Sequence, residues 1–376
     1  MKLLLINYEF PPVGGGAANA TSFLAREFAT AGHEVTVLTT AFGSLRGTST
    51  ESGFEVVRVW TGRRRAGTSN PFEMFSFMAA AMIPALRLAR RRRFDAAIAF
   101  FAIPSGPVAA LLRHAFGIPY LVSQRGGDVP GGFPEIDAVH RLITPLRRAV
   151  LRRATAIVAN SPSLAQLSMA ADPFPVEIIP NGVDPLVFAP EAANAAPDDE
   201  FRILYVGRLH SQKNVAALVA SAAALSALPG PPVVLEIVGD GPERGALEKL
   251  FERSGATLAL RWQGWLAKQD VVTCYQRAHV VVSPAFYEAM PNTVLEAMAC
   301  AVAVVASRVG GNEDLVIEGE TGFLFDPAAP EQLTAALQRL RLDPALRREL
   351  GARGRRRVVD AFSWPRIAAQ YLRLLS

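Results

Sequence analysis

Two carboxylates that lie close together in the sequence could bind the hydroxyl groups of a ligand. Glu288 comes shortly after residues 280–284 (VVVSP), a run typical of a buried strand, and Glu296 lies in the apolar stretch 293–300 (TVLEAMAC). Asn292 is predicted to cap that helix, which puts Glu296 in its second turn. An ionised carboxylate in such surroundings is costly unless it is exposed or paired, and it can accept hydrogen bonds from vicinal sugar hydroxyls. The pair could hold two different diols, or Glu296 could only mark the polar edge of an amphipathic helix.

Two cations follow the predicted strand at residues 201–207 (FRILYVG). Arg208 comes directly after Gly207, and Lys213 precedes a helix predicted to begin near Asn214. Arginine gives forked hydrogen bonds, lysine gives a mobile charge, and the start of a helix adds partial positive charge. The segment therefore suits a diphosphate, and two solvated loop cations are the alternative.

A run of three glycines follows the predicted strand at residues 2–7. Glycine between a strand and a helix lets backbone amides approach an anion. Gly14 and Gly16 fit the dinucleotide-binding pattern, but Asn19 stands where its third glycine belongs. No Gly-Lys-Ser/Thr follows, so a P-loop is excluded. A tight turn without a ligand is the alternative.

Arg125 and Asp128 follow the predicted strand at residues 120–123. Arg125 could face the negative charge of a leaving diphosphate or of an acceptor phosphate, and Asp128 could pair with Arg125 or orient it. Residues 181–184 (NGVD) end the last predicted strand of the first half, where a turn and hinge is sufficient explanation.

Other chemistries have little support in the sequence. The histidines are scattered, and none has a second histidine four residues away, so no metal site is predicted. Cys274 and Cys300 have no nucleophile context and suggest a reduced compartment without disulfides. The arginine clusters at 63–65 and 90–93 lack interleaved aromatic residues. We therefore expect no metal, no other cofactor and no nucleic-acid partner.

Strand-like and helix-like runs alternate along almost the whole chain. With 376 residues, 50% of them hydrophobic, the chain is expected to form two globular α/β domains. Residues 185–200, rich in Pro, Ala and acids, are the best linker candidate. Ligands of such doubly wound sheets bind at the carboxyl ends of the strands. Strands are predicted at residues 2–7, 34–40, 54–60, 95–100, 120–123, 154–160 and 176–180, and then at 201–207, 233–239, 258–264, 280–284 and 303–307.

The excess positive charge lies in the first half of the chain. Residues 1–185 contain 19 Lys and Arg against 13 Asp and Glu, a net charge of +6, whereas residues 186–376 contain 20 against 21. This distribution suggests an anionic partner, such as a phosphorylated acceptor or a membrane surface. A solvated, arginine-rich surface is the alternative.

Residues 71–93 form an apolar, Met- and Phe-rich stretch that ends in four arginines. The stretch could lie at a membrane surface or near a lipid-linked acceptor, or it could be a core-facing helix with a basic end. No segment is expected to span a bilayer, because the longest candidate, residues 74–86, is too short and contains Pro84. No secretory signal is evident, so we expect a cytoplasmic protein, with attachment to the inner face of the membrane as an open alternative.

Taken in order, these segments resemble the retaining glycosyltransferases of family 4 (glycosyl transferases group 1), which have the GT-B fold. The resemblance covers essentially the whole chain. It implies two doubly wound, Rossmann-like domains facing a central cleft: an acceptor-binding domain at residues 1–185, a nucleotide-sugar-binding domain at 186–360, and a C-terminal helix at 361–376 that crosses back to the first domain. The matching segments are PPVGGGAAN, IPNGVD, VGRLHSQKN, EAMPNTVLEAMAC, ASRVGGNEDLV, GETGFLF and FSWPRIAAQYLRLL.

The same resemblance implies roles for the candidate site residues. Arg208 and Lys213 would bind the donor diphosphate and act in catalysis. Glu296 would hold the ribose, and Glu288 would hold the transferred sugar and also act in catalysis. The other donor-binding residues that it implies are Gly15, Gly16, Met290, Pro291, Asn292 and Thr293.

Two departures from the family pattern affect these roles. Where the family often has Gly-Phe-Gly after the first glutamate, this chain has Ala289-Met290-Pro291. Many members carry histidine near the position of Arg125, and arginine cannot act as a base at neutral pH. Arg125 and Asp128 are therefore retained only as candidates on the acceptor side.

The resemblance implies transfer of a sugar from a UDP- or GDP-linked donor to an acceptor hydroxyl, with retention of configuration and without a metal. The implied setting is synthesis of a cell-surface polysaccharide or glycolipid. A nucleotide-sugar epimerase and a non-catalytic nucleotide-sugar-binding protein are alternatives on the same fold. Paired carboxylates also suit a hydrolase, but Arg208 and Lys213 would then be unexplained.

Overall fold

The structure is a computed structural model that describes residues 1–65, 70–131, 137–191 and 197–375. The chain divides into two compact units. The first contains Met1–Asn181 and Trp364–Ser376, and the second contains Gly182–Ser363. The division falls four residues before the predicted boundary at 185/186 and three residues after the one at 360/361. The predicted linker at 185–200 belongs to the second unit, and its residues 192–196 lie outside the described residues.

The first unit contains an eight-stranded sheet with the order β3-β4-β2-β1-β5-β6-β7-β8. All neighbouring strands are parallel except β3 and β4. Helices cover both faces of a parallel sheet, which explains the continuous apolar strands such as Leu3, Leu4 and Leu5, all fully buried. The strands are β1 (Lys2–Ile6), β2 (Glu34–Thr40), β3 (Gly47–Glu51), β4 (Phe54–Val59), β5 (Ala96–Phe100), β6 (Tyr120–Gln124), β7 (Ala156–Ala159) and β8 (Glu177–Ile178).

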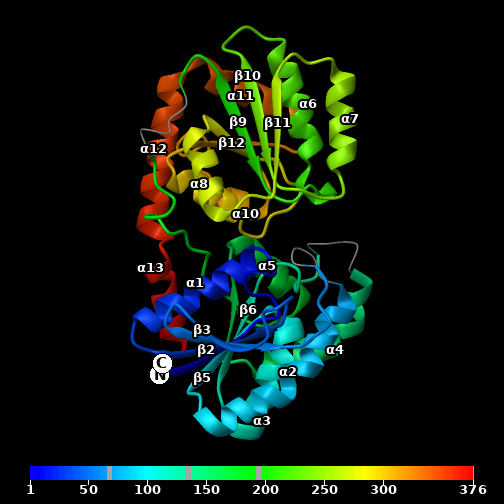
Figure 1. The fold of residues 1–376 in the computed structure, drawn as a ribbon, viewed down its shortest axis with the longest axis vertical. Coiled ribbons are helices and arrows are strands. Elements are labelled where there is room, and N and C mark those ends of the chain that lie inside the picture. Colours follow the sequence, from blue (N-terminus) through cyan, green and yellow to red (C-terminus); the bar gives the residue numbers. More distant parts are fainter. Residues whose placement is uncertain (66–69, 132–136, 192–196, 376) are drawn as a thin grey trace. The chain divides into compact units, whose positions relative to one another are not determined.

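Two groups of helices accompany this sheet (Figure 1). Helices α1 and α13 pack against each other, and α3 packs between α2 and α4. The helices are α1 (Gly16–Thr30), α2 (Pro71–Arg92), α3 (Gly106–Phe116), α4 (Asp137–Arg153), α5 (Pro162–Ala171) and α13 (Trp364–Leu375), with a short helical turn at Phe101–Ser105.

Helix α2 corrects one expectation from the sequence. It has 22 residues and a mean hydropathy of 1.4 in its most apolar window, so it is long and apolar enough to cross a membrane by length and composition. The prediction that no segment is long enough was therefore wrong, because Pro84 lies inside the helix without ending it. The same test is passed by core helices, and α2 buries Phe77, Ala81, Ala85 and Ala89, a stripe with one residue in every four. Length alone therefore does not make α2 a membrane span.

The last helix of the chain packs within the first unit. Trp364 stacks on Phe23 of α1, with ring centroids 5.0 Å apart. The Tyr371 hydroxyl lies 2.8 Å from Ser123 Oγ at the end of β6 and accepts a hydrogen bond of 3.2 Å from Arg125 Nη2. Helix α13 therefore completes the core of the first unit, although the whole second unit, Gly182–Ser363, separates it in sequence from the rest of the first unit.

The second unit is built on a six-stranded parallel sheet with the order β11-β10-β9-β12-β13-β14. The predicted pair of Rossmann-like α/β domains is confirmed. The strands are β9 (Phe201–Val206), β10 (Val233–Val238), β11 (Ala259–Gly264), β12 (Val280–Ser283), β13 (Ala303–Ser307) and β14 (Phe323–Phe325). The helices are α6 (Val215–Ser226), α7 (Arg244–Ser254), α8 (Lys268–Arg277), α9 (Asn292–Ala299), α10 (Gly310–Leu315), α11 (Pro330–Leu342) and α12 (Pro344–Ala361).

Replacing Tyr371 with Ala should destabilise the first unit, because the change removes a fully buried aromatic ring and leaves Ser123 and Arg125 without its hydroxyl. The expected loss is about 3–5 kcal/mol in the free energy of unfolding, the usual range for aromatic-to-alanine changes in cores. Denaturant unfolding of the full chain measures it. Arg366→Ala, at an exposed position of the same helix, is the matched control. Equal stability of the two variants would contradict a core role for α13.

Candidate functional site

The predicted site residues of the second unit lie at the carboxyl ends of its central strands. Strand β9 pairs with β10 on one side and with β12 on the other, all in parallel. Their carboxyl ends therefore share one edge of the sheet, the edge at which such sheets bind ligands. Arg208 and Lys213 follow β9, and Glu288 follows β12.

Close backbone packing joins the loops after β9 and β10. Gly207 N donates to Val238 O at 2.9 Å, and Leu209 N donates to Asp240 O at 3.0 Å. Glycine is required here, since a Cβ on Gly239 would lie 1.9 Å from the Gly207 carbonyl oxygen. The start of the Arg208–Lys213 segment is therefore fixed by its own backbone.

Gln212 joins the loop after β9 to the loop after β12. Its carbonyl oxygen accepts from Phe286 N, and its side-chain Nε2 donates to Tyr287 O, each at 2.9 Å. These two bonds hold the residues that follow, Lys213 and Glu288, next to each other. Lys213 Nζ lies 2.5 Å from Glu288 Oε1.

The Lys213–Glu288 ion pair is mostly shielded from water. The side chains are 22% and 13% exposed, respectively. Attraction between two charges strengthens where water is partly excluded, so the pair holds each side chain in a defined position. The sequence assigned these two residues to separate tasks, and the structure brings them into direct contact.

The neighbouring backbone also orients Glu288. Its carbonyl oxygen accepts from Gly311 N at 2.8 Å.

Tyr205 holds the backbone of Arg208, because its hydroxyl donates to Arg208 O at 2.9 Å. Burial raises the pKa of Tyr205, and the nearby negative charge of Glu288 adds to the shift, so the phenol stays a donor. Arg208 itself is exposed at this edge.

Glu296 lies in the second turn of α9, as predicted, but the predicted cap is wrong. The helix begins at Asn292 after Pro291, and no side chain caps it. Pro291 has an extended backbone and offers no side-chain acceptor to the first turn of the helix. Glu296 Oε2 accepts a hydrogen bond of 2.9 Å from the Tyr275 hydroxyl of α8.

The environment of Glu296 changes its ionisation. Burial raises its pKa to about 7, although the hydrogen bond from Tyr275 and the positive charge of Lys268 lower it in part. The carboxyl therefore changes its protonation state near neutral pH. The other predicted donor residues lie at the start of the same helix: Met290 and Pro291 are buried, and Asn292 and Thr293 are half-buried.

The remaining predicted residues belong to the first unit. Gly15 precedes helix α1, and Gly16 is its first residue. Gly14 has a φ of +96°, and a Cβ there would lie 2.7 Å from the Glu9 side chain, so the turn itself demands glycine. The glycine run is thus at a strand-to-helix turn, as predicted.

Arg125 is engaged by other residues of the first unit. Its Nη1 donates to Asn181 Oδ1 at 2.5 Å, its Nη2 donates to Tyr371, and its guanidinium lies over the Phe100 ring at 5.0 Å. Arg125 therefore fastens the return helix α13 to the end of β6. The sequence offered no signal for this contact, because Tyr371 lies 246 residues away.

Asp128 orients the backbone of Arg125, not its guanidinium. Its carboxylate accepts from Arg125 N at 2.9 Å and from Ala102 N at 2.7 Å. Burial raises the pKa of Asp128, while these two hydrogen bonds oppose the shift. The buried Asp128 carboxylate therefore joins the segment after β5, at Ala102, to the loop after β6, at Arg125.

Family models match both halves of the chain. Residues 15–182 match the glycosyl transferase 4-like domain, and residues 189–357 match the glycosyl transferases group 1. Alpha-maltose-1-phosphate synthase of Mycolicibacterium smegmatis is 30% identical to this chain over 72% of the chain and 75% of that protein. The chain is a glycosyltransferase of group 1, family 4.

Solved structures share the fold of this glycosyltransferase. Sucrose-phosphate synthase of Thermosynechococcus elongatus superposes with a TM-score of 0.85 at 26% identity, covering 100% of this chain and 98% of that one. The Anabaena protein HepE, solved with UDP-glucose, gives a TM-score of 0.77 at 19% identity, covering 100% and 99%. At that identity the second likeness supports the fold alone. The predicted GT-B fold is confirmed.

Replacing Glu296 with Gln should remove a pH-dependent loss of stability. Because the folded pKa is raised, the neutral carboxyl favours folding fully at pH values below its ordinary pKa, and this contribution is lost as the pH rises through about 7. From about pH 5 to about pH 8, the wild-type glycosyltransferase should lose stability relative to the variant. Thermal unfolding at a series of pH values measures this. Glu252→Gln, on the exposed side of α7, should follow the wild type, and parallel curves for all three proteins would contradict the expectation.

Proposed function

We propose that this glycosyltransferase transfers a sugar from a UDP- or GDP-linked donor to an acceptor hydroxyl, with retention of configuration. The observation that carries the proposal is the Lys213–Glu288 ion pair at the carboxyl edge of the second unit's sheet. A cation for a phosphate and a carboxylate for sugar hydroxyls stand side by side there, on loops fixed by backbone hydrogen bonds. HepE, which shares this fold, has been solved with a donor of this class, UDP-glucose.

In this proposal, binding of the donor separates Lys213 from Glu288. Lys213 turns to the diphosphate together with Arg208, where the N-terminal end of α6 adds partial positive charge. Glu288 accepts hydrogen bonds from the transferred sugar in place of Lys213. Because both charges find new partners, neither is left buried and unpaired.

Glu296 binds the ribose in the same proposal. Its ionised carboxylate accepts from both ribose hydroxyls, while Tyr275 keeps one oxygen oriented. The backbone from Met290 to Thr293 lines the donor at the start of α9. Contacts of Gly15 and Gly16 with the donor, and of Arg125 with the acceptor, belong to the proposal as well. Asp128 acts on the acceptor side through the backbone of Arg125, which it holds.

The reaction proceeds by departure of the nucleoside diphosphate. The bond between the anomeric carbon and the phosphate oxygen breaks with its electron pair on the phosphate, where Arg208 and Lys213 offset the growing charge. The acceptor oxygen bonds to the anomeric carbon from the same face, and its proton passes to the leaving phosphate. Because these cations neutralise the diphosphate, we propose a reaction that requires neither a metal nor another cofactor.

The acceptor is proposed to belong to a cell-surface polysaccharide or a glycolipid. The support is the excess of basic residues in the first unit, which suits an anionic or membrane-bound acceptor. The corresponding location is the cytoplasm, at the inner face of the membrane.

The stereochemistry of the product tests the proposed reaction. A donor screen by thermal shift first identifies the nucleotide sugar that stabilises the full chain. Proton NMR of the product formed from that donor should then show the same anomeric configuration as in the donor, with or without a chelator of divalent metals. An inverted product would overturn retention. Epimerised donor in the absence of an acceptor would show an epimerase, and tight donor binding without transfer to any acceptor would show a non-catalytic binding protein.

Lys213→Ala should reduce turnover by about 10²–10³-fold, the usual cost of removing one group that stabilises developing charge. The change also leaves Glu288 without its partner, so thermal unfolding must confirm that the variant folds. Lys249→Ala, at an exposed position of α7, is the matched control and should keep full turnover. Steady-state kinetics of a folded Lys213→Ala protein that equal those of the wild type would remove Lys213 from the phosphate role.

A further inference from the structure

The outward side of α2 is apolar although it is exposed. Only 28% of the residues in its most apolar 18-residue window are buried, so burial does not account for the composition of the helix. Phe72 is 77% exposed and Ile83 is 60% exposed, on the side away from the buried stripe. No charged residue occurs from position 74 to position 86, and the helix then ends in a run of arginines.

Helix α4 repeats this combination. Leu142 is 81% exposed and Leu146 is 39% exposed. Exposed arginines flank them on the same side, among them Arg141 and Arg152. From residue 140 to residue 153 the sequence contains five arginines and no acidic residue. The outward side of α4 is therefore both apolar and strongly basic.

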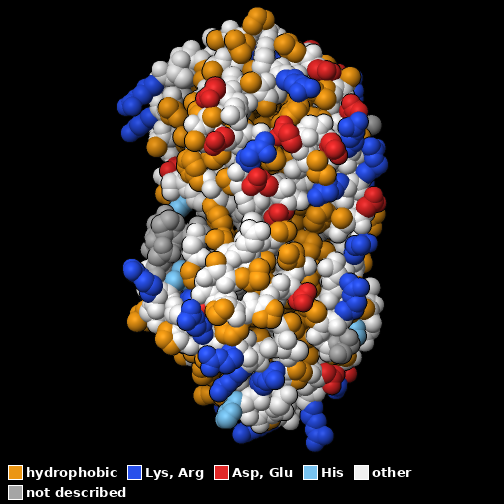
Figure 2. Space-filling model, turned by 180° about the vertical axis from the view of Figure 1, so that it is seen from behind, with side chains coloured by type: hydrophobic (Ala, Val, Ile, Leu, Met, Phe, Trp, Pro, Cys, Tyr) orange, Lys and Arg blue, Asp and Glu red, His pale blue; other side chains and the backbone are white. Residues whose placement is uncertain are grey.

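Helix α3 joins these two helices. It packs against α2 and against α4, so the three helices are neighbours, and we call their outward sides together the basic face. Its own outward side ends in Arg113, His114 and a partly exposed Phe116. The sequence of α3 contains no acid, and Glu73, the single acid of α2, is buried in the cap of that helix. Figure 2 shows Lys and Arg side chains gathered with hydrophobic ones on the lower part of the view.

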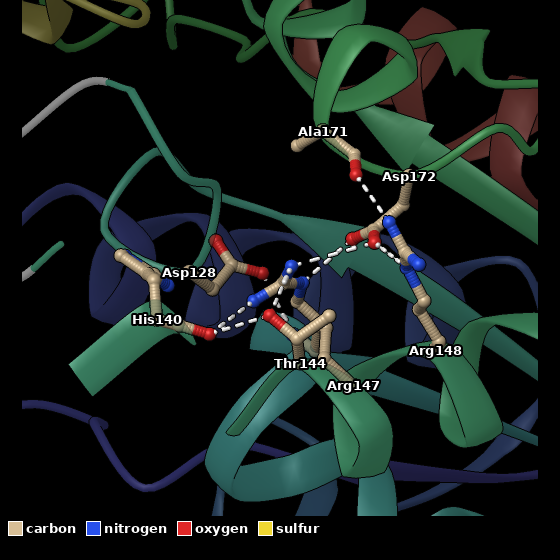
Figure 3. A network of polar contacts seen from close by, with 8 residues as sticks. Asp128, His140, Thr144, Arg147, Arg148, Ala171 and Asp172 are labelled. Atoms are coloured by element: carbon tan, nitrogen blue, oxygen red, sulfur yellow. Dashed lines mark hydrogen bonds and ion pairs between the residues drawn. The ribbon is translucent and has the colours of Figure 1, made fainter. Parts of the chain in front are cut away.

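A buried network fixes α4 in its orientation (Figure 3). Arg147 Nε donates to Asp172 Oδ2 at 2.6 Å, and its Nη1 donates to His140 O at 3.1 Å. Arg148 Nε donates to the other Asp172 oxygen at 2.7 Å. Burial alone would raise the pKa of Asp172, but the two guanidinium groups outweigh it, and the net shift is downward. With Arg147 held inward by an ionised carboxylate, Leu142 and Leu146 are presented outward without further ordering.

We propose that the basic face binds the surface of an anionic lipid bilayer. Exposed Phe, Ile and Leu side chains enter the boundary between headgroups and acyl chains, and the arginines contact the anionic headgroups. The helices lie along the surface and do not cross the bilayer, since Phe77 and the three alanines of the buried stripe hold α2 in the core of the first unit.

Charge complementarity favours an anionic bilayer over a second copy of the chain as the partner of the basic face. A second copy of the chain that met the same face by twofold symmetry would bring arginines against arginines. The inference concerns residues of the first unit, whereas the proposed donor residues tested above belong to the second. Its failure and that of the proposed function are therefore distinguishable.

Flotation of the full chain with vesicles tests the proposal. The protein should float with phosphatidylcholine vesicles that contain phosphatidylglycerol, should not float with phosphatidylcholine alone, and should be released by salt. Lys213→Ala should float like the wild type, which separates binding from turnover. Failure to float with the anionic vesicles at low salt, or equal flotation with both kinds, overturns the proposal.

Paired variants assign the binding to the basic face. Arg90→Gln with Arg91→Gln should weaken partitioning about thirtyfold, as expected for two arginines near an anionic surface. Phe72→Ser with Ile83→Ser should weaken it by at least a comparable factor. The matched controls are exposed residues of the second unit, Arg253→Gln with Arg261→Gln and, for the apolar pair, Leu228→Ser.

The same variants distinguish membrane binding through the basic face from binding elsewhere on the chain and from a dimer. All the variants of the basic face and their matched controls change exposed positions, and thermal unfolding confirms that they fold. An equal loss of flotation in the control variants overturns the assignment to this face. A concentration-dependent dimer that the Arg90/Arg91 variant abolishes, without any flotation of the wild type, assigns the face to a second copy and also overturns the proposal.

Discussion

Close backbone contacts between neighbouring loops are the constraint on which the candidate site depends. Gly239 approaches Gly207 so closely that no side chain fits between them, and Gln212 binds the loop after β12 through both its backbone and its side chain. Loops held in this way fix Lys213 and Glu288 before any ligand arrives, and a site fixed in advance loses less entropy on binding. The ion pair follows from the loop geometry, so the proposed exchange of this pair for the donor would leave the loops of the site in place.

The two carboxylates of the site differ because their surroundings differ. Glu288 has a cation within 2.5 Å. Glu296 is held by a neutral phenol donor in an apolar helix, and burial raises its pKa to about 7 although the hydrogen bond from Tyr275 opposes the shift. Two carboxyl groups in different environments can serve different tasks on one ligand. A hydrolytic pair needs both groups at one bond, and these two instead have different partners on different elements. The arrangement favours two separate hydroxyl contacts on an extended donor.

The sequence predicted most of the fold because parallel strands buried on both faces are continuous apolar runs. Every strand predicted from such a run is present. Among the residues that the structure describes, two strands were missed: β3, a polar edge strand, and β14, a three-residue strand. The site was predictable where chemistry and spacing are local, as for Glu296 in the second turn of α9. The partners of these residues were not, because Tyr275 lies on another helix, 21 residues from Glu296, and Tyr371 lies 246 residues from Arg125, and neither contact has a local pattern. The role of Arg125 in fastening α13 depends on one such distant partner.

Helix α2 shows why hydropathy could not distinguish its environments. A core helix, a membrane span and a surface-bound helix can have the same apolar composition, and what separates them is which sides of the helix are covered. In α2 one residue in four is buried from Phe77 to Ala89, which fixes the helix to the sheet, while Phe72 and Ile83 stay exposed. A helix that only packs against the protein core would carry polar residues on its outer side. Packing within the protein therefore does not explain why the exposed side of α2 is apolar and ends in arginines. The proposed contact with an anionic membrane surface accounts for both the exposed apolar side chains and the arginines.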